Sequence, residues 1–243
     1  MRYHSVEPAV FLERPNRFIA RVICGGREET AHVKNTGRCR ELLIPGARVY
    51  VQRHRNPARK TALSLIAVEK DGRLVNIDSQ APNAVWQEAL AGGLLLPGRP
   101  EAAALIRREA VFGDSRLDFY MEKQDEKYLM EVKGCTLEID GIGYFPDAPS
   151  ERAVRHLHEL MYAVKQGYHC ILAFVIAMPG VMVVRPNMTT HPAFGQALSE
   201  AMAAGVEVWY LPCEITADSI QIKGRKRKYY TVQDGLYPHM VIQ

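Results

Sequence analysis

The stretch "YLMEVKGCTL", residues 128–137, alternates like a β-strand and carries two opposite charges on one of its sides. Successive side chains of a strand point to opposite faces of a sheet, so Glu131 and Lys133 share one face. A carboxylate and an ammonium placed in this way form either an ion pair on an exposed strand or two parts of one site. The apolar side chains of the opposite face are Tyr128, Met130 and Val132.

The preceding segment "SRLDFY", residues 115–120, predicts a second strand, in which Leu117 and Phe119 face the core and Asp118 faces the other side. The short gap between the two strands suits a hairpin, which would make them antiparallel neighbours. Asp118 and Glu131 could then come close, with Lys133 one pleat further along.

Two carboxylates that converge in a partly buried pocket repel each other unless a positive charge lies between them. Mg²⁺ accepts carboxylate oxygens and several waters, so we expect a metal site at Asp118 and Glu131, with Mn²⁺ as the alternative ion. Lys133 would then hold an activated water or stabilise charge on a phosphate. The plainer alternative is an ion pair between Glu131 and Lys133 on an exposed strand.

A long helix is predicted from Ser150, a good N-cap residue, to Gly167. A polar stripe on this helix could lean over the strand carboxylates and contact a phosphate or a metal-bound water, or could be a solvated face. The helical repeat places His158 on another face, and the histidines lack the spacing of a zinc site. Steps of three and four residues place four side chains in the stripe: Arg152, Arg155, His156 and Glu159.

Residues 82–243 predict helices over 83–93 and 101–110, two strands, the long helix, a buried strand, another helix and a final strand. The apolar run at 169–177 suits a strand that is covered on both faces. This order predicts an α/β (α+β) domain built around a mixed sheet.

Residues 1–81 predict five short strands separated by Gly-rich turns, which favours a small all-β, OB-like barrel. Tyr50 lies among Arg48, Arg53 and Arg55, an arrangement typical of a base-stacking platform beside phosphate-binding groups. An ordinary basic barrel exterior would give the same pattern.

The net charge of +4 is divided unevenly along the chain. Residues 1–80 hold 15 Lys and Arg against 8 Asp and Glu, a net charge of +7. Residues 81–222 hold 11 against 18, a net charge of −7, and "KGRKRK" at 223–228 adds five positive charges. Such asymmetry favours a polyanionic partner, although an uneven solvated surface would also produce it.

Five cysteines are scattered without a CxxC pair, which fits free thiols in a reducing compartment. The chain shows no signal-peptide pattern and no apolar run long enough to span a bilayer. We therefore expect a cytoplasmic protein without membrane association, and we make no prediction of its oligomeric state.

Several motifs together resemble those of the sugar fermentation stimulation protein (SfsA) family. The resemblance rests on "PNRF", "AHVKNTGRCRELLIPG", "SRLDF", "EVKGCTL" and "YFPDAPSERAVRHLHEL". It implies an OB-like N-terminal domain, a C-terminal domain of the PD-(D/E)xK restriction-endonuclease-like fold, DNA binding and a link to sugar (maltose) metabolism.

By this resemblance, Asp118 stands at the strand aspartate of that nuclease class, and Glu131 with Lys133 stands at its E-x-K. Glu109 takes the place of a supporting helix glutamate. The "NTGR" loop, with Asn35, Thr36, Gly37 and Arg38, looks suited to a phosphate or another ligand, or is an ordinary tight turn.

Two functions follow from these residues, with a small-ligand sensor that uses the "NTGR" loop as a third. The first is DNA binding with little sequence preference, since the sequence has no helix-turn-helix or zinc-finger signal. The alternative is a metal-dependent nuclease acting through Asp118, Glu131 and Lys133, assisted by Glu109 and His156. The residues expected to contact nucleic acid are Arg38, Arg40, Arg48, Tyr50, Arg53, Arg55, Arg152 and Lys226.

Overall fold

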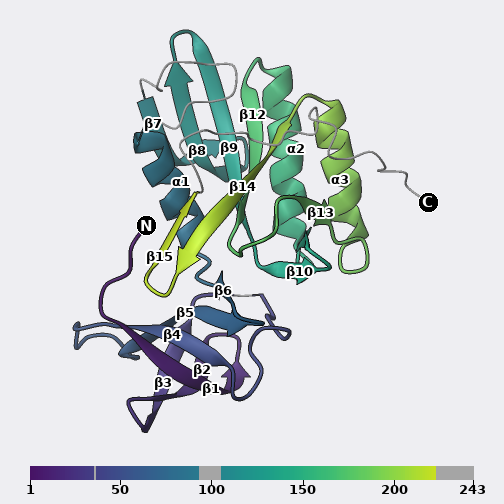
Figure 1. The fold of residues 1–243 in the computed structure, drawn as a ribbon. Helices are drawn as coiled ribbons and strands as arrows, with labels where there is room; N and C mark the ends of the chain where they lie inside the picture. The colour runs from purple at the N-terminus through teal and green to yellow at the C-terminus, as the bar shows by residue number, and fades with distance from the viewer. Residues whose placement is uncertain (36, 93–104, 223–243) are drawn as a thin grey trace.

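The computed structural model describes residues 1–35, 37–92 and 105–222, which form a β-barrel and a larger α/β part (Figure 1). The barrel sheet has the order β3-β2-β1-β4-β5-β6, and an additional parallel pairing of β3 with β5 closes five of its strands. Its strands are β1 (Val6–Asn16), β2 (Ile19–Cys24), β3 (Arg27–Val33), β4 (Arg48–Arg53), β5 (Leu63–Lys70) and β6 (Arg73–Asn76).

Alternation in sequence becomes an inside and an outside in the barrel. In β2, Ala20, Val22 and Cys24 are buried, while the residues between them are exposed. Such a strand buries one apolar face and keeps the other in water, which is the pattern that closes a small barrel around a core.

The larger part is a mixed six-stranded sheet of order β15-β14-β12-β9-β8-β7. The central strand β12 (His169–Ile176) pairs in parallel with β9 (Glu126–Cys135) and β14 (Glu207–Thr216), and it is buried along nearly its whole length. The outer strands β7 (Leu105–Phe112), β8 (Ser115–Lys123) and β15 (Ser219–Ile222) pair antiparallel. The mixed α/β sheet predicted from the sequence is therefore present.

Helices cover both faces of this sheet. The apolar side of α1 (Ala81–Ala91) packs with Trp86 against Trp209, whose ring centroid lies 6.0 Å away. On the other face α2 (Glu151–Lys165) and α3 (Pro192–Ala203) lie side by side (Figure 1). A small sheet of β10 (Leu137–Ile139), β11 (Ile142–Phe145) and β13 (Val184–Pro186) borders them.

The helix predicted over residues 101–110 is wrong for the part that the structure describes. Residues from Leu105 onward form strand β7, which pairs with β8 from Leu105↔Glu122 to Phe112↔Ser115. Seven residue pairs across the hairpin provide backbone partners that local helix propensity cannot match, so tertiary pairing decides the conformation.

The barrel and the α/β part are joined by backbone hydrogen bonds as well as by sequence. Asn76 N–H at the end of β6 donates to Ala177 O after β12, at 2.9 Å. Tyr3 N–H donates to Asp218 O at 2.7 Å, and the amino group of Met1 donates to Ile220 O at 2.8 Å. The N-terminal segment is thereby tied to the far end of the described chain.

The cysteines agree with the predicted free thiols. All five cysteines are buried as free thiols. Across the described ranges, no helix is long and apolar enough to cross a membrane.

Candidate functional site

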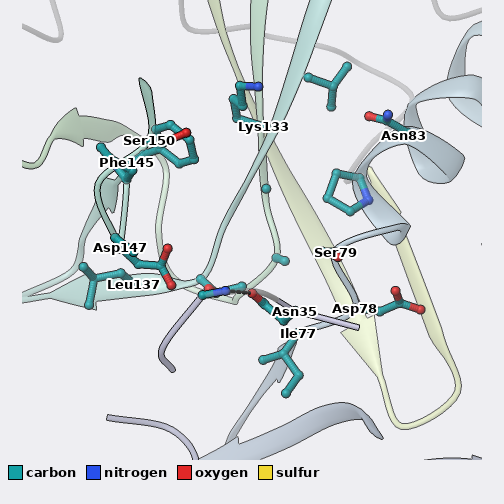
Figure 2. Close-up of a pocket in the computed structure, with 18 of the residues that line it drawn as sticks. Asn35, Ile77, Asp78, Ser79, Asn83, Lys133, Leu137, Phe145, Asp147 and Ser150 are labelled. Carbon is teal, nitrogen blue, oxygen red and sulfur yellow. Dashed lines mark hydrogen bonds between the residues drawn. The ribbon is translucent and has the colours of Figure 1, made fainter. Parts of the chain in front are cut away.

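A cleft of about 690 Å³ lies where the barrel meets the α/β part. Figure 2 shows Asn35 and Asp78 on its barrel side and Lys133, Asp147 and Ser150 on the other. The charged side chains that line it are Arg17, Asp78, Glu109, Asp118, Glu131, Lys133, Asp147 and Arg152. The predicted acids and the predicted lysine therefore meet in one place.

Asp118 lies where two neighbouring strands separate. The ladder between β8 and β9 ends at the pair Phe119↔Met130, so the backbone beyond it loses its partner. Asp118 supplies one instead: its Oδ2 accepts the Val132 N–H at 2.8 Å, and its Oδ1 accepts from Asn83 Nδ2 at 2.8 Å. The opening between the strands is what gives the carboxylate its place in the cleft.

Glu131 is almost completely buried, with 1% of its surface exposed. One oxygen, Oε1, accepts from both Lys133 Nζ and His156 Nδ1. The other oxygen, Oε2, is buried without any hydrogen-bond partner among the described residues. A buried carboxylate oxygen without a partner is costly, so this atom marks a place for a ligand.

His156 connects the cleft to helix α2. Its Nδ1 contacts Glu131, and its Nε2 lies 3.3 Å from Arg152 Nε, which donates to it. Because an ionised carboxylate only accepts, the Nδ1–H donates and Nε2 is free to accept from the guanidinium. Arg152 thus holds the imidazole in the tautomer that Glu131 requires.

The remaining members of the predicted polar stripe lie next to this contact. Arg155 and Glu159 line a neighbouring groove of about 510 Å³, together with His156. His158 also borders this groove, but it is exposed whereas His156 is buried, as expected for two residues on different faces of α2. The side chains fan out from the helix and reach one groove from more than one direction.

The two strand carboxylates differ in their electrostatics. Burial, and then the charge of Glu131, raises the pKa of Asp118 above its ordinary value. Burial alone would also raise the pKa of Glu131, but the charges and hydrogen bonds of Lys133 and His156 outweigh it and hold that pKa below its ordinary value. Asp118 is therefore the acid that a cation would relieve most.

The cleft is acidic on balance. Five carboxylates face three cationic side chains in its lining, so a phosphate would be repelled unless a cation entered first. No group of three or more His, Cys, Asp or Glu side chains in the described part of the chain is already arranged as a metal site. Two protein carboxylates with several waters suit Mg²⁺, which keeps part of its hydration shell.

Glu109 lines the cleft from a strand, whereas the resemblance placed it on a helix. Its φ is +52°, a left-handed conformation that is uncommon for a side-chain-bearing residue. The pair Glu109 and Asp118 is missing from the otherwise regular ladder of β7 and β8. Next to this irregular pair in β8, Leu117 packs in the core on the α2 side of the sheet, while Phe119 packs on the α1 side. The prediction that Leu117 and Phe119 share one face of the strand is therefore wrong.

The "NTGR" loop is held by a residue that sequence reasoning missed. The Arg14 guanidinium donates to the carbonyl oxygens of Arg17, Asn35, Gly37 and Arg38 at 2.7–2.9 Å. Three of these four carbonyl groups belong to the loop, so this one side chain fixes the loop at the cleft edge. Thr36 lies outside the described residues.

Gly37 packs directly against Asp147, a second missed residue. A Cβ on Gly37 would lie 2.0 Å from Asp147 Oδ2, so the position has room for glycine alone unless the carboxylate moves. Burial raises the pKa of Asp147. The sequence gives no signal for this contact, because it joins segments about a hundred residues apart whose proximity depends on the assembled fold.

The predicted nucleic-acid contacts are spread over different environments. Arg53 donates to Glu7 at 2.6 Å and to Glu29 at 2.8 Å, so its charge is compensated within the barrel. Tyr50 is half-buried against the apolar cluster around α1, with the Arg48 guanidinium 5.7 Å from its ring centroid.

Other predicted contacts remain at the surface. Arg38, Arg40 and Arg55 on the barrel part are exposed, and Arg152 is exposed at the first turn of α2 beside the cleft. Lys226 lies outside the described residues.

Comparisons with known proteins cover both parts of the chain. Residues 12–77 match the model of the SfsA N-terminal OB domain, and residues 80–219 match that of the sugar fermentation stimulation protein RE domain. These matches confirm the predicted OB barrel and the restriction-endonuclease-like fold of the larger part.

Individual relatives extend over nearly the whole length. A sugar fermentation stimulation protein homolog of Desulfitobacterium hafniense is 48% identical over 221 residues, covering 91% of this chain and 95% of the relative. One from Clostridium beijerinckii is 48% identical, covering 92% and 97%. Among solved structures, Pyrococcus furiosus SfsA in complex with Ca²⁺ is 31% identical with a TM-score of 0.83, covering 92% of this chain and 96% of that one.

Proposed function

The chain belongs to the sugar fermentation stimulation protein family, and from this premise and its cleft we propose that it is a divalent-cation-dependent nuclease. In this proposal Asp118 and Glu131 hold the cation, and Lys133 acts on the scissile phosphodiester or on the attacking water. The observation that carries it is the buried, unpaired Oε2 of Glu131 in the cleft that also contains Asp118 and Lys133.

The residues of the site fit a divalent cation. An ion bound between the two carboxylates would give Glu131 Oε2 its missing partner and would relieve the repulsion that raises the pKa of Asp118. The P. furiosus relative was solved in complex with Ca²⁺, and by similarity we assign this class of ion to the present site. For catalysis we propose Mg²⁺, with Mn²⁺ as the alternative.

When bound, a divalent cation supplies a Lewis acid that lowers the pKa of water and offsets charge on a phosphate. The protein's own side chains contribute position and charge. His156 and Lys133 fix Glu131 by holding Oε1, which leaves Oε2 directed to the ligand. The Lys133 ammonium, 15% exposed, can stabilise the negative charge that builds on the phosphate oxygens.

Nucleic acid is the substrate class that the surroundings favour. The barrel segment, residues 1–80, carries a net charge of +7 and forms one wall of the cleft. Exposed Arg38 and Arg40 follow the loop at the cleft edge, and Arg152 lies on the opposite side. A polyanion would therefore be drawn by the rim towards an acidic centre that needs a cation.

Nucleic-acid binding without cleavage is a second candidate, and the positive charge of the barrel favours it independently of the acidic site. In this form the protein would bind DNA with little sequence preference. Regulation of sugar (maltose) metabolism would then depend on binding alone. The two candidates differ in what they require of Lys133, because electrostatic binding has no need of a partly buried lysine paired with a carboxylate.

The test is an assay for cleaved product. End-labelled single-stranded DNA, duplex DNA and RNA are each incubated with the purified protein in Mg²⁺, Mn²⁺, Ca²⁺ or EDTA. We expect cleavage in Mg²⁺ or Mn²⁺, loss in EDTA, and a decrease of about 100-fold or more in Lys133→Met. Lys127→Met, an exposed lysine on the same strand, is the matched control. Absence of cleavage in every combination would leave binding alone.

A further inference from the structure

The turn between β1 and β2 presents an aromatic ring to solvent. Phe18 lies at the tip of this hairpin, and 45% of its surface is exposed. Phe11, on the same hairpin, is 1% exposed and belongs to the barrel core. The barrel core therefore accommodates the ring of Phe11, whereas the ring of Phe18 lies outside the core.

A cationic side chain lies over this ring and reaches the cleft. The Arg17 guanidinium is 4.6 Å from the centroid of the Phe18 ring, within the range of a cation–π contact. Arg17 also lines the cleft that contains Asp118, Glu131 and Lys133. The exposed ring therefore lies next to a residue that lines the candidate active site.

The tip is held in place by hydrogen bonds to its backbone. Phe18 N–H donates to Asn16 Oδ1 at 2.9 Å, and Phe18 O accepts from Val33 N–H at 2.7 Å. Arg17 O accepts from the Arg14 guanidinium at 2.7 Å, the same side chain that fixes the "NTGR" loop. An exposed ring on a fixed backbone loses little conformational freedom when a ligand stacks on it.

We propose that Phe18 and Arg17 form a stacking platform for a nucleobase of single-stranded nucleic acid at the mouth of the cleft. This inference deepens the proposed function by naming its substrate class. A base in a duplex is already paired and stacked, whereas a base in a single strand offers its face to an aromatic ring. A guanidinium beside the ring can stack on the base or contact the adjacent phosphate.

Phe18 suits this role better than Tyr50, the aromatic residue that the sequence pattern indicates. The Tyr50 ring is half-buried against the apolar cluster around α1. Phe18 combines exposure with a neighbouring cation, Arg17, that lines the cleft. The motif "PNRF", residues 15–18, therefore has a physical reason for its arginine and its phenylalanine.

The first test uses a fluorescent reporter at the platform. Phe18→Trp keeps an aromatic ring, and the two natural tryptophans, Trp86 and Trp209, are fully buried. The probes are a 12-nucleotide homopyrimidine DNA strand, its duplex, and an abasic strand of the same length, all in Ca²⁺. We expect quenching by the base-containing single strand and little by the abasic strand or the duplex. Equal quenching by the abasic strand would overturn the proposal.

The second test measures affinity by fluorescence anisotropy with the same probes. Phe18→Ala should weaken binding of the base-containing strand by about 5- to 100-fold and leave binding of the abasic strand unchanged. Ile23→Ala removes another exposed apolar side chain of this hairpin and should change neither affinity. An unchanged affinity in Phe18→Ala, or a folded variant that loses both strands equally, would contradict a stacking role.

The outcomes separate this inference from the proposed function. Lys133→Met should lose cleavage but keep the preference for bases over the abasic strand. If the protein never cleaves nucleic acid yet shows this preference, the stacking platform is supported and the proposed nuclease activity is refuted. If the protein cleaves duplex and single strands equally and Phe18→Ala has no effect, the nuclease activity is supported and the stacking platform is refuted.

Discussion

His156 donates from Nδ1 to the same oxygen of Glu131 that Lys133 contacts, so that the other carboxylate oxygen is left buried and unpaired. Both side-chain partners of Glu131 contact Oε1, so Oε2 is the oxygen that a ligand could contact. Arg152 completes the chain by donating to His156 Nε2. Three residues therefore fix the orientation of one carboxylate, which is the usual arrangement around a metal ligand.

Removing the His156 donor should weaken cation binding. We expect His156→Leu to lower Ca²⁺ affinity by about 10- to 100-fold, because Glu131 would no longer be held with Oε2 towards the ion. His156→Asn, whose amide can donate from nearly the position of Nδ1, should recover much of that affinity. Isothermal titration calorimetry with Ca²⁺ measures both, and the exposed His158→Leu is the control. Wild-type affinity in His156→Leu would show that Glu131 needs no such support.

Lys133 should separate cleavage from cation binding. The Lys133 ammonium contacts Glu131 Oε1 and would repel a Ca²⁺ ion bound to the same carboxylate. We therefore expect Lys133→Met to bind Ca²⁺ at least as tightly as the wild type. Its cleavage should nevertheless be lost, since the charge that stabilises the phosphate is gone. Calorimetry and the cleavage assay on one preparation check this pair. Loss of Ca²⁺ binding together with activity would mean that Lys133 only shapes the site.

How much of this site could be predicted depends on the range of the contacts involved. Strand alternation places Glu131 and Lys133 on one face, and a short hairpin brings Asp118 to them, so local rules suffice. The contact of Gly37 with Asp147 joins two parts of the fold and leaves no pattern in the sequence. The sequence predicts a helix at Glu109, but pairing of β7 with β8 outweighs local propensity and makes this segment a strand.

The contact of Gly37 with Asp147 predicts a large effect from a small substitution. Gly37→Ala would place a Cβ 2.0 Å from Asp147 Oδ2, and we expect it to lower the free energy of unfolding by about 1–3 kcal/mol. Asp147→Ala removes the obstructing atoms. The double variant should therefore lose less free energy of unfolding than the sum of the losses in the two single variants. Urea denaturation of the four proteins measures this coupling, and additive losses would contradict the contact.

The Arg53 cluster predicts a pH dependence of stability. Hydrogen bonds from Arg53 lower the pKa of Glu7 and of Glu29 below their value of 4.5 in the unfolded chain. Depressed carboxylate pKa values contribute stability above that value, and the contribution is lost as pH falls through the folded-state pKa. Arg53→Met should therefore cost about 1 kcal/mol at pH 7, a small figure because the groups are about a third exposed.

The difference between wild type and Arg53→Met should shrink as the pH falls below 4.5, because both carboxylates become protonated as the pH passes their lowered folded-state pKa values. Urea denaturation across this range measures it. Arg48→Met is the matched control, because Arg48 lies 4.0 Å from its partner Glu69 and forms a weaker pair. A difference that stays constant until both carboxylates are protonated would show that Arg53 stabilises the barrel by packing alone.

Arginines that already form ion pairs within the protein should contribute less to nucleic-acid binding than unpaired, exposed arginines. Arg38 and Arg40 are exposed and follow the cleft-lining Gly37 in sequence, whereas the charge of Arg53 is already compensated by two glutamates. Each phosphate contact to a single strand contributes about 0.7 to the slope of log affinity against log salt. The double variant Arg38→Ala/Arg40→Ala should reduce that slope by about 1.4, while Arg53→Ala leaves it unchanged. Anisotropy titrations from 50 to about 200 mM salt distinguish the two variants. Equal slopes in both would place the phosphate path away from the "NTGR" loop.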